Sequence, residues 1–121
     1  MARGIDTFCA EAIIDKMGKN TNLRLHAVLP CPDQQLNWPQ KDKDRFEKIL
    51  AKTSTKTIIS PLYTDTCMLS RNRFMVDNSD RLIAVWNGFF KGGTAYTVRY
   101  AKNKNKEIHL IRPKDLSVTI L

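Results

Sequence analysis

The sequence predicts an α/β protein with a mostly parallel sheet of about four strands and helices on both faces. Two observations predict it. Segments with apolar residues at helical spacing alternate with short apolar runs, and Gly or Pro residues separate most of them. This alternation is typical of βαβ crossovers. A chain of 121 residues, 42% of them hydrophobic, is expected to form a single domain over residues 1–121.

The first half of the chain is predicted to hold two helices and two strands. The first helix starts at Asp6 or Thr7, which can cap it, and stops at Gly18. Phe8 is expected on its apolar side. Pro30 and Pro61 end the two strands. The predicted elements are a helix over Thr7–Met17, a strand over Leu23–Leu29, a helix over Asp42–Lys52 with Phe46, Ile49 and Leu50 facing inward, and a strand over Lys56–Ser60.

The second half continues the alternation. The run LIAVW is entirely apolar, as is typical of a strand covered on both faces of a parallel sheet. The residues after Pro113 form a tail, 113–121, that is expected to add a short edge strand or remain irregular. The predicted elements are a helix over Thr66–Asn78, a strand over Leu82–Trp86, a helix over Thr94–Lys102, a strand over Glu107–Ile111 and the edge strand Val118–Leu121.

The net charge indicates a class of partner, and the cysteines indicate a cellular compartment. Twenty Lys and Arg against twelve Asp and Glu give a net charge of +8, which favours anionic partners such as phosphates or nucleic acid. Three widely spaced cysteines without a CxxC motif favour free thiols and a cytoplasmic location over a disulfide framework or a metal site. No apolar run is long enough to suggest a membrane partner.

The expected ligand site lies at the carboxyl edge of the sheet, where loops meet helix N-termini. Four segments reach that edge: residues 1–6 (MARGID), 30–39, 60–72 and 87–94 (NGFFKGGT). NGFFKGGT is favoured, because Gly92 and Gly93 allow backbone N–H groups to approach an anion and Thr94 adds a hydroxyl. A tight turn without a ligand is the competing interpretation.

Five motifs occur in the order and spacing of a known superfamily: MARGID, SPLYT, RNRFMVDNSD, LIAVWNG and GGTAYTVRYA. The chain resembles the SLOG superfamily, which includes the DprA/Smf and LOG proteins, and within it the YpsA-like branch. The resemblance extends from Met1 to about Leu116 and implies a Rossmann-like three-layer sandwich. It also implies that a strand, a helix and another strand precede MARGID in family members, so that this chain is N-terminally truncated relative to them.

The resemblance implies a ligand edge that binds a nucleotide or a derivative such as an ADP-ribose-like molecule through phosphate and ribose. The resemblance therefore places the ligand at the same carboxyl edge of the sheet that the loops and helix N-termini indicate. No metal-binding residue is assigned. No catalytic residue is assigned either, because Thr97 stands where LOG-type phosphoribohydrolases carry a catalytic Glu, which disfavours activity as an enzyme. The predicted ligand-binding residues are Ala2, Arg3, Gly4, Asp6, Ser60, Tyr63, Arg71, Asn72, Asn87, Gly92, Gly93 and Thr94.

Two other functions remain open at this point. Tyr63, Tyr96 and Tyr100 could stack on bases, and with the charge of +8 they are compatible with a DprA-like protein that binds single-stranded nucleic acid. The third hypothesis is a truncated interaction protein, for example of a mobile element, that has lost ligand binding. It would form a homo-oligomer, or bind a partner protein that covers the truncated sheet.

Overall fold

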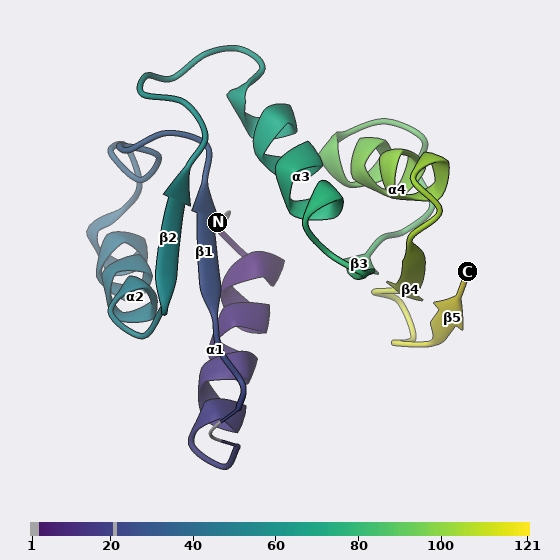
Figure 1. Cartoon of the computed structure of the whole chain (residues 1–121), viewed down its shortest axis with the longest axis horizontal. Helices are drawn as coiled ribbons and strands as arrows, with labels where there is room; N and C mark the ends of the chain where they lie inside the picture. Colours follow the sequence, from purple (N-terminus) through teal and green to yellow (C-terminus); the bar gives the residue numbers. More distant parts are fainter. Residues whose placement is uncertain (1–2, 21) are drawn as a thin grey trace. The chain divides into compact units, whose positions relative to one another are not determined.

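The computed structural model describes residues 3–20 and 22–121. The chain divides into two compact units, a first unit Met1–Cys67 and a second unit Met68–Leu121 (Figure 1). None of the described helices is long and apolar enough to cross a membrane. The elements are α1 (Ile5–Met17), β1 (His26–Leu29), α2 (Gln40–Leu50), β2 (Thr55–Ile58), α3 (Cys67–Asp77), β3 (Arg81–Val85), α4 (Gly93–Asn103), β4 (Glu107–Ile111) and β5 (Val118–Ile120).

The first unit contains a parallel pair of strands, β1 and β2, whose register runs from His26 opposite Thr55 to Leu29 opposite Ile58. Helices α1 and α2 contact one another. Phe46 is 2% exposed, in an edge-on contact with the Trp38 ring at 5.3 Å between centroids. The inward face predicted for α2 is therefore confirmed at its largest residue, which anchors the core of this unit.

The second unit is a three-stranded sheet in the order β3-β4-β5, with β3 parallel and β5 antiparallel to β4. Helix α4 contacts both β3 and β4. The fully buried Ala95 and Ala101 bring the α4 backbone close to its neighbours, as small residues allow. Buried residues from α3, β3, α4 and β4 form one cluster: Val76, Ala84, Val98, Ala101 and Ile108.

The prediction of one mostly parallel sheet of about four strands is wrong in its pairing. Each predicted helix and strand is present, including the edge strand Val118–Ile120, but the described strands fall into two sheets, and the second is mixed. Periodicity predicts the type of each element, whereas pairing depends on which backbones exchange hydrogen bonds. The crossovers through α2 and α4 link only β1 to β2 and β3 to β4.

Two predicted buried positions are exposed. Phe8, assigned to the apolar side of the first helix, is 59% exposed, and its ring lies 4.8 Å from the Arg45 guanidinium carbon. Thr7 and Ala10 are the buried residues of α1. In the strand predicted to be covered on both faces, Ala84 is buried but Ile83 is 63% exposed. Only one face of the second sheet is covered by the helices of its own unit.

The cysteines are free thiols, as predicted from their number and spacing. Cys9 is exposed, whereas Cys31 and Cys67 are buried. Burial raises the pKa of the Cys31 thiol, and a hydrogen bond with Asp33 adds to the effect. These buried thiols therefore behave as small apolar groups of the core in the first unit.

Candidate functional site

The loop after β3 is held by three hydrogen bonds to its backbone. Asn87 Oδ1 accepts a hydrogen bond from the N–H of Phe89 at 2.9 Å, which closes a local turn. The indole N–H of Trp86 donates to the Phe89 carbonyl at 2.9 Å, and Arg99 Nη1 donates to the Phe90 carbonyl at the same distance. These contacts fix the path of residues 87–90 as they approach α4. Asn87, predicted to bind the ligand, shapes this loop.

The start of α4 follows that loop directly. Gly92 precedes the helix with φ +103°, a backbone conformation that L side chains rarely adopt, and a Cβ there would meet no atom within 4 Å. No side chain caps this end of α4. The first N–H groups of a helix have no intrahelical acceptor, so the start of this helix offers donors and the positive end of its dipole without a capping side chain.

Asn72 of α3 adds a side-chain donor beside the same glycines. Arg71 Nε donates to Asn72 Oδ1 at 2.8 Å. Because a guanidinium can only donate, this bond fixes the amide with its oxygen toward Arg71. Asn72 Nδ2 then lies 4.0 Å from the position that a Cβ on Gly93 would occupy. The structure therefore brings together two motifs, RNR and GGT, that are about twenty residues apart in sequence.

Arg71 is 5% exposed, an uncommon state for a guanidinium, since burying a charge is costly unless the group is paired and hydrogen-bonded. Its neighbour Arg73 is exposed and bonds Ser70 Oγ at 3.3 Å. Residues two apart on a helix point to different sides, and here one arginine is buried and the other exposed. Arg71 is the one that orients Asn72.

The two threonines of this region differ in their surroundings. Thr94 is exposed in the first turn of α4. Thr97 Oγ1 donates to the Gly93 carbonyl at 2.8 Å, a bond within the helix. The position at which a Glu is expected from the LOG resemblance is therefore occupied by a hydroxyl engaged with the helix backbone.

The other predicted site residues belong to the first unit. Arg3 Nη1 lies 3.3 Å from Asp42 Oδ2, and the Arg3 guanidinium carbon lies 5.6 Å from the centroid of the Trp38 ring. Gly4 precedes α1 with φ +82°. Ala2 lies outside the described residues. Three further predicted residues lie in the same unit: Asp6 in the first turn of α1, Ser60, whose Oγ donates to the Leu62 carbonyl at 2.5 Å, and Tyr63, which is 66% exposed.

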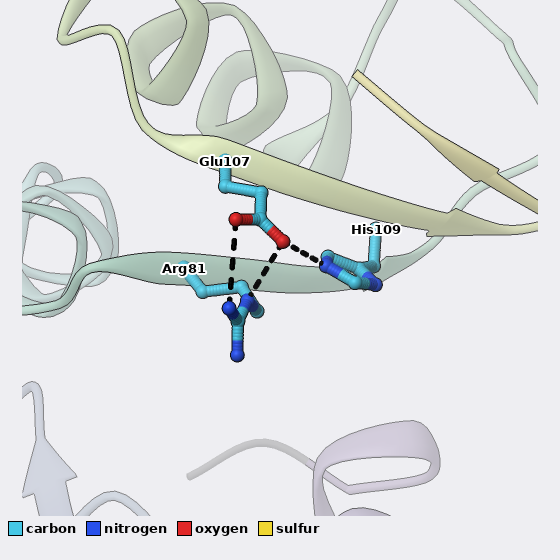
Figure 2. A network of polar contacts seen from close by, with 3 residues as sticks. All are labelled: Arg81, Glu107 and His109. Carbon is cyan, nitrogen blue, oxygen red and sulfur yellow. Dashed lines mark hydrogen bonds and ion pairs between the residues drawn. The ribbon is translucent and has the colours of Figure 1, made fainter.

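A polar network that the sequence analysis did not assign joins β3 to β4 (Figure 2). Arg81 Nε lies 2.9 Å from Glu107 Oε1, and His109 Nε2 lies 2.5 Å from the same oxygen. The contacts with His109 and then Arg81 lower the pKa of the Glu107 carboxyl. Arg81 and Glu107 face each other across the parallel pair, so the network stabilises the register of β3 on β4.

Helix α4 of the second unit thus starts in a small region of hydrogen-bond donors. The N–H groups of its first turn and the amide of Asn72 contribute, with the Thr94 hydroxyl nearby. Such a set of donors at a helix N-terminus is suited to an anion, and phosphate is the usual biological case. We call this region, made of Asn72, Gly92, Gly93 and Thr94, the donor cluster.

The chain is similar to known proteins over nearly its whole length. The family model described as the YspA SLOG family matches residues 2–116. The UPF0398 protein YpsA of Bacillus subtilis is 24% identical over 97% of this chain and 68% of its own length. A UPF0398 protein of Bacillus pumilus is 24% identical over 83% of this chain and 55% of its own length, and one of Bacillus cereus is 26% identical over 85% and 57%.

The chain spans about half to two thirds of the length of these curated relatives. The match to the family model, in contrast, includes the helices and strands from α1 to β4 and leaves out only β5 among the described elements. It also contains every residue of the donor cluster. The chain therefore belongs to the YspA SLOG family.

Proposed function

We propose that the second unit binds a nucleotide or a nucleotide derivative through a phosphate group at the donor cluster. The observation that carries the proposal is the position of Asn72 Nδ2 beside Gly93, with its orientation set by Arg71. Two segments far apart in sequence supply donors to one point. A negatively charged, oxygen-rich group is the chemistry that such donors recognise.

Membership of a SLOG-type family supports the same proposal, because the resemblance already implied phosphate and ribose binding at this edge. Each group of the site then has its own role. The N–H groups at the start of α4 would bind the phosphate, Asn72 Nδ2 would donate to one of its oxygens, and Arg71 would act as a positioning residue. Thr97, which stands where LOG enzymes carry a catalytic Glu, donates to the Gly93 carbonyl. This supports binding as the primary function of the cluster.

Isothermal titration with ADP and AMP at low salt tests the proposal. We expect wild-type binding, and about tenfold weaker binding by Arg71→Ala, because the Asn72 amide loses the bond that orients it. Arg71→Lys tests the same point in a chain that keeps the charge but loses the Nε–H donor. Arg73→Ala, on the exposed side of the same helix, is the matched control and should bind as the wild type does. Absence of any binding at millimolar nucleotide would refute the proposal.

A further inference from the structure

Beside the donor cluster, the loop after β3 presents two neighbouring aromatic rings to solvent. Phe89 is 56% exposed and Phe90 is 67% exposed. Their ring centroids are 5.1 Å apart, with an interplanar angle of 43°. Single exposed apolar residues are common on protein surfaces. A contiguous aromatic pair is less common, and we call it the Phe89–Phe90 platform.

The loop that carries this platform is held in place by hydrogen bonds to its backbone. The hydrogen bonds from Trp86 Nε1 and Arg99 Nη1 end on the carbonyls of Phe89 and Phe90, and Asn87 accepts from the Phe89 N–H. Every one of these contacts uses the backbone of the two residues. The backbone is therefore fixed while both side chains remain outside the core, so that either ring can be replaced without removing a hydrogen bond that holds the loop.

The charges around the platform favour an anionic ligand. Lys91 Nζ lies 5.5 Å from the centroid of the Phe90 ring, and Arg99 reaches the Phe90 carbonyl. An apolar docking surface for an ordinary protein partner would need no such bias. An aromatic surface with cations beside it is the combination that recognises a base attached to phosphate.

The distance between the platform and the donor cluster is short enough for one small ligand to contact both. Phe90 precedes Gly93 by three residues, a stretch of chain that spans at most about 11 Å. A mononucleotide has a comparable length from its phosphate to its base. A ligand with its phosphate at the start of α4 can therefore lay its base against Phe89 or Phe90.

We infer that the Phe89–Phe90 platform stacks the base of the ligand whose phosphate is bound by the donor cluster, so that this site selects ligands that carry a nucleobase over simple sugar phosphates. This inference rests on the proposed function. It adds the part of the site that contacts the base and selects for it, which the donors alone do not supply, since any phosphate would satisfy them. The same base-plus-phosphate chemistry is offered by free nucleotides and by single-stranded nucleic acid.

The test compares two probes that differ in the base. ADP carries phosphate and base, and ribose 5-phosphate carries phosphate only. For the double variant Phe89→Ala/Phe90→Ala we expect ADP affinity to fall about tenfold while ribose 5-phosphate affinity is unchanged, because one stacking contact is lost. Phe89→Tyr/Phe90→Tyr keeps the rings and should bind ADP as the wild type does. Phe74→Ala, which removes a partly exposed ring from α3, controls for the loss of an aromatic side chain.

The outcomes separate this inference from the proposed function. Wild-type protein that binds neither probe at millimolar concentration refutes both. Binding of both probes that the double variant leaves unchanged, or weakens equally, overturns the platform alone. A single-stranded oligonucleotide measured beside ADP identifies the source of the base: tighter oligonucleotide binding that weakens with salt and is lost in the double variant indicates a nucleic-acid strand. Tighter ADP binding with the same loss indicates a free nucleotide.

Discussion

Asn72→Asp is expected to weaken ADP binding by about two orders of magnitude while the second unit remains folded. The change replaces Nδ2, the donor beside Gly93, with a carboxylate oxygen of nearly the same size. The ligand loses a charge-assisted hydrogen bond, worth about 1.5–3 kcal/mol, and meets a like charge in its place. The contact from Arg71 Nε to the other oxygen is kept. Titration calorimetry of the wild type and the variant measures the difference.

Asn78→Asp provides the matched control for this substitution. Asn78 directly follows α3, and its Nδ2 donates to the Phe74 carbonyl at 2.8 Å. The control introduces the same charge just beyond the C-terminal end of the same helix, and ADP should bind within about twofold of the wild type, as expected for a screened surface charge. Equal losses in the two variants would indicate a general effect of net charge and would contradict the assignment of Asn72.

Phe46→Ala is expected to lower the free energy of unfolding by about 3–5 kcal/mol, because a large buried ring is removed and a cavity is left. The side chain is 2% exposed and contacts the Trp38 ring. Leu36→Ala in the same unit, at a side chain that is 61% exposed, should change stability by less than about 0.5 kcal/mol. Urea unfolding followed by circular dichroism measures both values.

The same variant tests whether the chain is one domain, as its length predicts. Each unit contains one of the two tryptophans, Trp38 in the first and Trp86 in the second. In a Trp38→Phe background, Trp86 fluorescence reports the second unit alone. If the units unfold together, Phe46→Ala shifts the Trp86 transition to lower urea, as in a two-state system. A Trp86 transition that does not move would show that the units are separate domains.

The elements were predictable because each carries a local signal. Glu107–Ile111 was predicted with the bounds that the structure shows, since an apolar run follows a polar turn there. The first helix was also predicted, but the side it buries was not. Its apolar residues are too scattered to define one face, and the actual contacts are made by Thr7 and Ala10. Burial depends on which neighbours pack against a helix, and a single segment does not contain that information.

Strand pairing and the details of the site depend on contacts between distant residues. The sequence indicated the Gly92–Gly93 turn from local chemistry, whereas Arg71 and Asn72 were predicted together with the family resemblance. It could not show that the Arg71 bond sets the orientation of the Asn72 amide, because that depends on side-chain geometry. The loop that carries Phe89 and Phe90 was predicted at the ligand edge, but no role was assigned to the two rings. Their exposure becomes evident only once the loop is seen.

The proposed binding of a nucleotide phosphate by the donor cluster at the start of α4 can be observed in solution. The most direct measurement is the shift of backbone amide resonances in ¹⁵N-labelled protein during titration with ADP. If the proposal is correct, the largest shifts occur at Gly93, Thr94 and the Asn72 side-chain amide. Binding of ADP that leaves these three signals unmoved, or the absence of any shift at millimolar ADP, would contradict it.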